Sequence, residues 1–469
     1  MNQIVSARRL ARELGEWRSH RAAYLSLADR IRVMLIDGRL TSGSRLPAER
    51  ELSAALQISR TTVAAAYAQL REDSYLRSIR GSGSTLALPG GMRGTPSGPQ
   101  EMALDFSKAA AATYPGLPAA YQFAVEQLPN YLGHHGFDMQ GLPELRAAVA
   151  DHYGQRGLPT TPDQILITLG AQHALSLLTH TIYSPGERIL IEHPTYPHAI
   201  DTFAGAGARL LAMPVSSSEG WDIAEGQMLI RRAAPSMAFL MPDFQNPTGA
   251  SMSAEDRERL ARLAQREGTV LIADETTALL DIDRGELPPL AAFSGSVVTI
   301  GSLGKLAWGG MRIGWIRGPR DLLAKVHRAR PAFDLGTPML EQLASIALLR
   351  EADLMIANRS RNLRSGRDFL VEELASHFPQ WKVELPNGGM SLWINTGEMS
   401  SSALALASRS EGLALVPGPR FGLEGAFERY LRLPFTYPQD DMRDGIRALL
   451  KASRSVGAAP ARMPLQAVI

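Results

Sequence analysis

Residues 297–305 read Val-Val-Thr-Ile-Gly-Ser-Leu-Gly-Lys, a β-branched run that ends in glycine, serine and lysine. A short apolar run bounded by turn formers predicts a buried strand. Four similar runs lie upstream, separated by longer helical stretches, at Gln164–Thr168, Arg188–Glu192, Met237–Met241 and Val270–Ala273. This alternation predicts an α/β body with a mostly parallel sheet covered by helices on both faces.

The residues that follow these runs are candidates for a ligand site, because ligands bind at the carboxyl ends of parallel strands. Gly170 follows the first run, and the backbone N–H groups of Ala171 and Gln172 then open a helix, which predicts an anion site. The other strand ends present an aromatic ring, an amide, a carboxylate, a hydroxyl, an amine and a guanidinium, on Tyr196, Asn246, Asp274, Ser302, Lys305 and Arg312.

Pyridoxal phosphate needs this combination of groups. A lysine forms the Schiff base, and a carboxylate keeps the pyridinium nitrogen protonated as an electron sink. An aromatic partner for the ring, a donor to its hydroxyl and a phosphate clamp complete the set. Each group alone is more often solvated, packed or part of a turn. Their joint order along the chain predicts a pyridoxal 5'-phosphate site.

The motifs of the body resemble those of fold-type I aminotransferases across residues 105–450. They are Asn246-Pro-Thr-Gly, Asp274, Ser302-x-x-Lys305, Arg312 and, further on, Leu431-Arg-Leu-Pro-Phe. The resemblance implies that Lys305 is the catalytic lysine and that Asp274 pairs with the ring nitrogen. It also implies ring contacts from Tyr196 and Asn246, and a phosphate cradle of Ala171, Gln172, Ser302 and Arg312. Arg432 would bind the α-carboxylate of an amino acid, a bidentate task that suits guanidinium.

Two positions depart from that family. Its members usually have a tyrosine two or three residues after the aspartate, where this chain has Asp274-Glu-Thr-Thr. Thr276 or Thr277 could donate a hydrogen bond there but cannot replace a phenol. A tyrosine of the neighbouring subunit often reaches the phosphate as well, and here the corresponding segment offers only Phe137. We expect cofactor binding to survive both changes and catalytic tuning to suffer.

The first ninety residues predict a different kind of domain. They carry fourteen arginines, no lysine and eight acids, a net charge of +6 that leaves −4 for the remainder. The pattern is helix, helix, helix, hairpin, with Ser59 as N-cap of the third helix and Val63, Tyr67 and Leu70 as its buried face. Basic and hydroxyl residues in or beside that helix could meet DNA: Arg45, Arg50, Arg60, Thr61, Thr62 and Arg80. The alternative is a small helical adaptor whose arginines merely face solvent.

Short sequence motifs within residues 22–88 resemble those of the GntR-type winged helix-turn-helix. They are Gly43-Ser-Arg-Leu-Pro-Ala-Glu-Arg, Ser59-Arg-Thr-Thr-Val and Gly81-Ser-Gly. A GntR-type domain fused to an aminotransferase-like body resembles the MocR family of bacterial transcription regulators. The resemblance implies a head-to-tail homodimer in which the front domain of one chain rests on the body of the other. Two such front domains would bind a repeated or palindromic DNA operator. It also implies a sensor of a small amine or amino acid, or of pyridoxal phosphate itself, through Schiff-base chemistry at Lys305.

Two other functions stay open at this point. The chain could be a catalytically active aminotransferase whose front domain only determines where the enzyme is located. It could also be a cofactor-free regulator that uses the body as a dimer scaffold, although Lys305, Asp274 and Arg312 argue against that.

Composition and the positions of turn-forming residues suggest the domain boundaries. We expect an N-terminal extension (1–20), the front domain (21–89), a Pro/Gly-rich linker (90–104) and the body (105–469), with a large subdomain at about 150–330 and a small one at about 340–455. The 469 residues include no cysteine, which excludes disulfides and thiolate metal sites, and the histidines lack metal-ligand spacing, so we expect no metal. No apolar run reaches the length of a membrane span. We therefore expect a cytoplasmic protein that does not bind membranes.

Overall fold

The computed structural model describes residues 4–15, 17–18, 22–36, 39–79, 83–87, 104–133 and 135–457. Arg80, the glycine turn at 81–82 and most of the expected linker lie outside the described residues.

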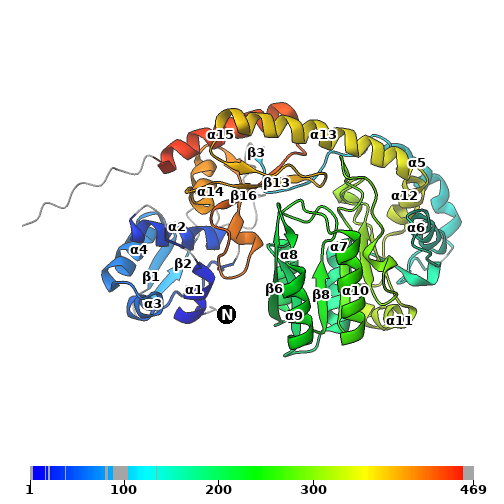
Figure 1. The fold of residues 1–469 in the computed structure, drawn as a ribbon, viewed down its shortest axis with the longest axis horizontal. Coiled ribbons are helices and arrows are strands. Elements are labelled where there is room, and N and C mark those ends of the chain that lie inside the picture. The colour runs from blue at the N-terminus through cyan, green and yellow to red at the C-terminus, as the bar shows by residue number, and fades with distance from the viewer. Residues whose placement is uncertain are drawn as a thin grey trace, which may run out of the picture.

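An eight-stranded sheet forms the centre of the large subdomain (Figure 1). In spatial order its strands are β4 (Ile165–Thr168), β11 (Gly314–Arg317), β10 (Val298–Ser302), β9 (Val270–Asp274), β8 (Met237–Leu240), β5 (Arg188–His193), β6 (Arg209–Ser216) and β7 (Gly220–Trp221). The pairs from β10 through to β6 are parallel, whereas β11 is antiparallel to both neighbours and β7 is antiparallel to β6. The predicted mostly parallel sheet is confirmed.

Helices cover both faces of this sheet, because successive strand residues point to opposite sides. Ile189 and Ile191 of β5 belong to a buried cluster with α7 (Ala171–Ile182), α8 (Pro197–Gly205) and α11 (Arg320–Ala329). Leu190, between them, joins the larger cluster on the other face. That cluster includes residues of α5 (Leu117–Gln127), α6 (Pro143–Gln155), α9 (Ile223–Ala233), α10 (Ala254–Glu267) and α12 (Met339–Arg350).

A four-stranded sheet and three helices form the small subdomain. The sheet order is β12 (Lys382–Val383), β13 (Ser391–Asn395), β16 (Tyr430–Pro434) and β15 (Val416–Pro417), and nearby β14 (Leu413–Ala414) pairs with β3 (Leu104–Asp105). The helices are α13 (Ala352–His377), α14 (Ser401–Ser410) and α15 (Gln439–Gly457). Helix α13 runs along the top of both subdomains in Figure 1. Its buried Arg359 donates from Nε and Nη2 to the Leu306 carbonyl, at 3.1 and 2.6 Å.

The front domain contains α1 (Ala7–Leu14), α2 (Ala23–Ile36), α3 (Glu49–Leu56), α4 (Arg60–Glu72) and a hairpin of β1 (Leu76–Ile79) and β2 (Gly83–Leu86). Residues 1–20 were expected to be a separate extension, and the structure differs. Leu10 and Leu14 of α1 are fully buried in the same core as Leu27, Leu52 and Tyr67. The apolar face of α1 therefore makes it part of the front domain.

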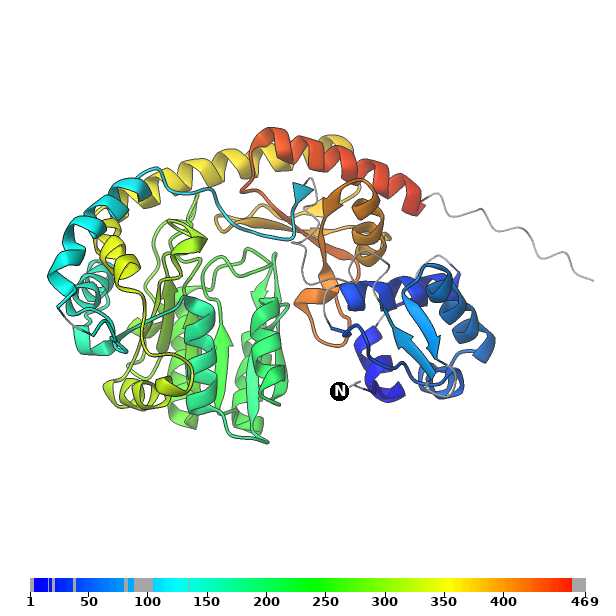
Figure 2. The same ribbon diagram turned by 180° about the vertical axis from the view of Figure 1, so that it is seen from behind.

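The front domain lies against the small subdomain of its own chain, whereas the resemblance predicted contact with the body of a second chain. Helix α2 packs beside α14, and both views show the blue domain next to the orange segment that leads to β16 (Figures 1 and 2). No helix among the described residues is long and apolar enough to cross a membrane.

Candidate cofactor and ligand site

A cavity of about 1150 Å³ lies between the large and small subdomains. We call it the main cavity. Five of the expected site residues line it, namely Tyr196, Asn246, Thr277, Lys305 and Arg432. Small-molecule sites usually occupy roughly 300–1,000 Å³, so this cavity has room for a cofactor and a second small molecule.

Lys305 lies just beyond β10, and its amine donates to Thr276 Oγ1 at 3.1 Å. Burial lowers the pKa of Lys305 below its ordinary value, and the nearby Asp274 carboxylate opposes that shift. Asp274 ends the neighbouring strand β9, and its Oδ1 accepts from the Thr276 backbone N–H at 2.9 Å. The parallel pairing of β9 and β10 thus brings a buried carboxylate and a desolvated amine to one sheet edge.

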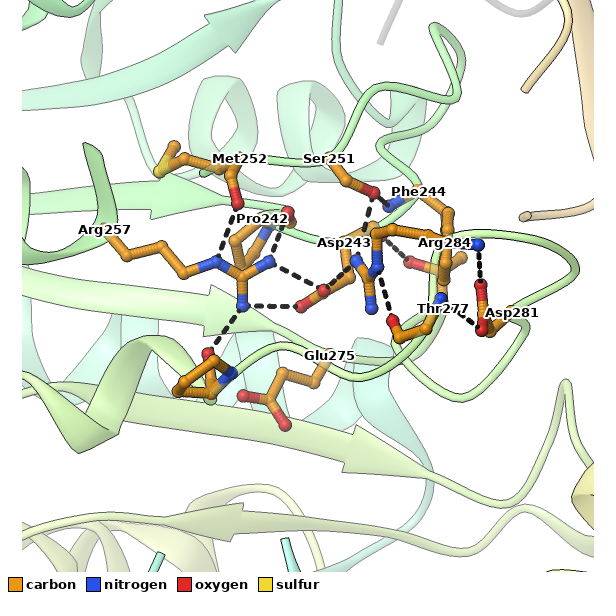
Figure 3. A network of polar contacts seen from close by, with 12 residues as sticks. Pro242, Asp243, Phe244, Ser251, Met252, Arg257, Glu275, Thr277, Asp281 and Arg284 are labelled. Carbon is orange, nitrogen blue, oxygen red and sulfur yellow. Dashed lines mark hydrogen bonds and ion pairs between the residues drawn. The ribbon is translucent and has the colours of Figure 1, made fainter. Parts of the chain in front are cut away.

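Thr277, the other threonine expected near the cofactor ring, hydrogen-bonds to the loop after β8 instead. Its hydroxyl donates to the Asp243 carbonyl at 2.7 Å. Asp243 is held by Arg257 at 2.7 Å and by Arg284, and Figure 3 shows both guanidinium groups directed at its carboxylate. Arg257 is fully buried, so the ion pair anchors the loop after β8. Thr276, and not Thr277, is the hydroxyl at the Lys305 amine.

Asn246 is presented by a turn that Gln245 organises. Gln245 Oε1 accepts from both N and Oγ1 of Thr248, at 3.0 and 2.7 Å. Its Nε2 donates to Glu192 at 3.0 Å and to the Pro194 carbonyl at 2.8 Å. Among the described residues the buried Asn246 Oδ1 has no hydrogen-bond partner. The turn therefore aims an amide with spare bonding capacity at the cavity.

Glu192 is a site-supporting residue that the sequence reasoning missed. It is fully buried in β5 and accepts from Trp221 Nε1 at 2.7 Å and the Met241 N–H at 2.9 Å. Burial raises the pKa of Glu192 to about 7, although these donors and Gln245 oppose the shift. The sequence did contain a signal for Glu192, namely a carboxylate at the end of the apolar run Ile189-Leu-Ile-Glu. A buried acid needs hydrogen-bond donors around it, so such a residue indicates a polar network.

The expected phosphate cradle lies at the turn between β4 and α7. Gly170 has φ +87°, and a Cβ at this position would lie 2.8 Å from Arg312 Nη2. Arg312 donates to the Leu169 carbonyl at 3.0 Å. Ala171 and Gln172 begin α7, whose first amides lack intrahelical partners. The structure therefore brings Arg312 and the amide end of α7 together.

Two side chains of that cradle have hydrogen-bond partners within the protein. Ser302 Oγ donates to the Ile313 carbonyl at 2.8 Å, and Gln172 Nε2 donates to Thr202 at 2.7 Å. The side chains of Ser302 and Arg312 are not part of the main cavity wall. Ser302 is half-buried and Arg312 is exposed.

Arg432 approaches the site from the small subdomain, on β16. Its Nη2 donates to the Ser107 carbonyl at 2.6 Å, and among the described residues its buried Nε has no partner. Burial lowers the pKa of Arg432 to about 10, which leaves a charged, desolvated guanidinium at neutral pH. Tyr196 lies on the same cavity wall, and burial raises its pKa to about 12. Sequence reasoning did not foresee that Arg409, Arg420 and Ile36 also line this cavity.

The candidate DNA-facing residues surround the start of α4. Arg45, Arg50, Arg60 and Thr61 are exposed and Thr62 is half-buried. Ser59 caps α4 by accepting from the Thr62 N–H at 3.1 Å, and its hydroxyl also meets Thr61 and Thr62. Arg60 lies 3.7 Å from Glu49 and keeps 71% of its side chain exposed. Arg60, Thr61 and Thr62 thus place one guanidinium and two hydroxyls in the first turn of α4.

The main cavity suits a phosphorylated aldehyde such as pyridoxal phosphate. A desolvated amine, a buried carboxylate and an amide oxygen without a partner among the described residues lie at neighbouring strand ends, and the absence of a side chain at Gly170 lets Arg312 lie against the start of α7. Among the described residues no group of three or more His, Cys, Asp or Glu side chains could hold a metal ion.

Comparison with known proteins agrees with this fit. Residues 119–449 match the family "Aminotransferase class I and II", and residues 23–86 match "Bacterial regulatory proteins, gntR family". The chain is 31% identical to 2-aminoadipate transaminase of Thermus thermophilus, over 68% of this chain and 81% of that protein. It is 26% identical to the "Probable rhizopine catabolism regulatory protein MocR" of Rhizobium meliloti, over 94% of this chain and 95% of that protein.

A solved structure shows the same body fold. The α-aminoadipate aminotransferase LysN from Thermus thermophilus, complexed with N-(5'-phosphopyridoxyl)-L-leucine, matches with a TM-score of 0.69 and 29% identity. The match covers 76% of this chain and 93% of that one.

Fold and site thus define a pyridoxal-phosphate-dependent aminotransferase-like body joined to a helix-turn-helix domain. The chain belongs to the aminotransferase class I and II family and, through its GntR-type front domain, to the MocR-type DNA-binding transcription regulators. Its cofactor is pyridoxal 5'-phosphate.

Proposed function

We propose that this regulator senses a small amine or amino acid, or the cofactor itself, in the main cavity and changes its hold on DNA in response. The observation that carries the proposal is that Lys305 and Arg432 share one cavity in a chain that also has a GntR-type domain, where Arg60 is exposed at the start of α4. With the cofactor held at Lys305, an amino acid would meet the cofactor with its amine and Arg432 with its carboxylate.

Each expected site residue then has a separate task. Lys305 would hold the cofactor through its amine, and its lowered pKa favours the neutral, nucleophilic form. Asp274 would hold the proton of the ring nitrogen, while Tyr196 and Asn246 would contact the ring. The amides of Ala171 and Gln172, with Ser302 and Arg312, would bind the phosphate. When bound, pyridoxal phosphate supplies reversible covalent bonding to primary amines and an electron sink.

Arg432 would select ligands that carry a carboxylate. Its guanidinium can form two parallel hydrogen bonds to such a group, and low local polarity strengthens them. The unpaired Nε supports this task, because a buried donor without a partner costs free energy until a ligand satisfies it.

The front domain would bind double-stranded DNA through Arg45, Arg50, Arg60, Thr61 and Thr62, and through Arg80, which lies outside the described residues. Helix α4 would enter the major groove with its first turn toward the bases. Such a role would place the protein in the cytoplasm with the DNA. A homodimer would present two front domains to a repeated or palindromic operator.

Exposed apolar side chains support the homodimer. Phe137, Phe333 and Leu335 are 73%, 44% and 55% exposed. They lie on neighbouring segments, since a Cβ at Gly336 would lie 2.6 Å from the Asp138 carbonyl oxygen. Exposed apolar groups that gather in this way are typical of an interface. The head-to-tail arrangement of the two chains stays a prediction.

Catalytic transamination is the second candidate, because the lysine, the aspartate and the arginine are all present. Thr276 argues against it, since a threonine hydroxyl cannot tune the cofactor as a phenol does. We expect an amino acid to bind and change the visible spectrum but to yield little keto acid.

The test compares ligand response with turnover. Full-length protein loaded with pyridoxal phosphate is titrated with L-2-aminoadipate and L-leucine, on a DNA duplex selected from a random-sequence pool. We expect a prompt spectral change and altered DNA affinity, both lost in Arg432→Ala and kept in Arg429→Ala, an exposed arginine of the same subdomain. Sustained keto acid production at about 1 s⁻¹ or more, with donor and acceptor in excess, would instead establish an aminotransferase.

A further inference from the structure

Helix α1 is part of the front domain but lies outside the residues that match the GntR family. That match covers residues 23–86, and α1 ends before it, at Leu14. Leu10 and Leu14 are fully buried in the core that α1 shares with α2, α3 and α4. The helix is therefore a packed addition to the helix-turn-helix.

The side of α1 that faces away from this core is basic. An α-helix turns by about 100° per residue, so Arg8 and Arg12 come opposite the two buried leucines, with Arg9 beside them. All three arginines are exposed. Arg9 pairs with Glu13 at 2.7 Å, and exposed pairs of this kind are weak, so a phosphate could compete with Glu13 for Arg9.

The segment before α1 fixes where this helix lies on the front domain. Ile4 forms a parallel bridge with Arg45, and the Val5 N–H donates to the Arg45 carbonyl at 3.0 Å. Arg45 in turn bridges Thr85 of β2, so the N-terminal segment extends the edge of the hairpin. The chain therefore enters α1 directly beside Arg45, one of the residues expected to contact DNA.

The two parallel segments each lead into an eight-residue helix, α1 and α3, and these helices pack against each other. Arg8 is the second residue of α1, and Arg50, an expected DNA contact, is the second residue of α3. Leu10 and Leu52, the fourth residues, are buried in the same core. In helix-turn-helix domains the helix before the recognition helix, here α3, crosses the phosphate backbone. The first turn of α1 therefore lies beside the element that is expected to cross the backbone.

The acids of this region leave the surface basic. Glu13 is paired with Arg9, and Glu49 lies 3.7 Å from Arg60 and 3.8 Å from Arg71. Exposed arginines thus occur at the start of α4, at the start of α3 and at the start of α1. Arginines gathered on neighbouring elements are typical of a surface that binds a polyanion.

We propose that α1 is a second DNA-contacting element, whose Arg8 and Arg9 bind backbone phosphates next to those that the start of α3 meets. This inference rests on the proposed function, because it needs α4 in the major groove of the same duplex. Phosphate contacts carry no sequence information, but they fix the register of the protein on DNA and strengthen binding to every sequence. Arg12 lies 3.9 Å from Glu424 of the small subdomain and is not part of the proposed surface.

The test compares how DNA affinity depends on salt in the full-length chain loaded with pyridoxal phosphate. Wild type and a double variant with Arg8→Gln and Arg9→Gln are measured on a duplex selected from a random-sequence pool and on an unrelated duplex. The plot of log affinity against log salt concentration should become shallower in the double variant, by about 0.9 for each lost phosphate contact. Affinity for both duplexes should fall by the same factor, because phosphates rather than bases are contacted. A double variant with Arg8→Lys and Arg9→Lys keeps the charges and should keep most of the slope.

The matched control carries Arg259→Gln and Arg262→Gln on α10, two exposed arginines that also pair with acids of their own helix. It removes the same charge from the body and should leave the salt slope unchanged. Hydroxyl-radical footprinting then locates the contacts. Wild type should protect backbone positions that the Arg8→Gln, Arg9→Gln variant leaves open and that Arg60→Ala still protects. Equal urea midpoints of the variant and wild type would show that the fold is intact.

Two results would overturn the proposal and leave the proposed function standing. One is an unchanged salt slope and footprint in the Arg8→Gln, Arg9→Gln variant while wild type binds DNA. The other is an equal loss of slope in the α10 control, because the effect would then come from net charge alone. If wild type binds neither duplex, the proposed function fails, and this inference fails with it.

Discussion

We expect cofactor attachment to depend on Lys305, which supplies an amine just beyond β10. We expect Lys305→Ala to lose the visible absorption band that the wild type shows after reconstitution with pyridoxal phosphate. The phosphate cradle at Gly170 and Arg312 should still bind the cofactor reversibly, so dialysis should remove it from the variant. Lys325→Ala, an exposed lysine on α11, is the control. A retained band in Lys305→Ala would assign the attachment to another amine.

Glu192 predicts a dependence of stability on pH. Burial raises its pKa from the ordinary value of 4.5 to about 7, so between these values the folded chain binds more protons at this site than the unfolded chain. The free energy of unfolding should therefore fall as pH rises through this range, by about 3 kcal/mol at most. Urea midpoints followed by tryptophan fluorescence at pH 5, 6, 7 and 8 measure the trend.

Glu192→Gln should flatten that pH trend and weaken the fold at all pH values. Its amide nitrogen would face donors from Trp221, Met241 or Gln245, and one unsatisfied donor costs about 1–3 kcal/mol. The matched control is Glu187→Gln at the exposed start of the same strand region. An equal pH trend in wild type and Glu192→Gln would show that another group is responsible.

Individual residues explain what sequence reasoning could and could not predict about the site. Lys305, Asn246, Tyr196 and Arg432 were predictable because each follows or lies in a recognisable motif. The different tasks of Thr276 and Thr277 were not, because only the packing of the loop after β8 decides which hydroxyl meets Asp243. The support from Glu192 likewise depends on tertiary contacts that no spacing along the chain reveals.

At the scale of elements, strands that read as a plain apolar run were predictable, and β6 and β11, whose runs contain proline, glycine or arginine, were not. β8, for example, is buried along its whole length and reads as an apolar run. β6 is half-exposed and contains Pro214, and β11 begins with glycine and ends with arginine. Their pairing with neighbours, rather than their composition, makes them strands.

Helix α4 is the element that should read DNA. Arg60 is exposed in its first turn, so Arg60→Ala should weaken binding to a selected duplex by about 1–3 kcal/mol if the side chain contacts a base. The visible spectrum should not change, because the site lies in the body. Arg262→Ala on α10, also an exposed helical arginine, is the control. Wild-type DNA affinity in Arg60→Ala would contradict the assignment of α4 as the recognition helix.

At the scale of the whole molecule, sequence patterns indicated two domains but not how they dock. Arg30 lies in α2 among Leu27, Ile31 and Met34, and nothing in that spacing distinguishes a solvated arginine from one buried between domains. Helix α1 presented the same difficulty, because its arginines hide a short apolar face that only the folded front domain covers.

The proposed dimer interface predicts that charged substitutions in it lower the molecular mass of the protein in solution. We expect the double substitution Phe137→Glu and Leu335→Glu to shift the protein from dimer to monomer, because charges would replace apolar groups in the proposed interface. Light scattering over a range of concentrations measures the shift. Leu385→Glu places the same charge at another exposed leucine and should leave the mass unchanged. A dimer that persists in the double variant would exclude this surface as the interface.

Arg359 ties the helix that spans both subdomains to the carbonyl of Leu306, the residue next to Lys305. The position of the Lys305 amine and the orientation of the small subdomain are therefore coupled through α13. A substitution far from the cavity that shifts α13 would therefore also shift the Lys305 amine. Such a substitution should therefore change the affinity for ligands in the main cavity without touching any residue that lines it.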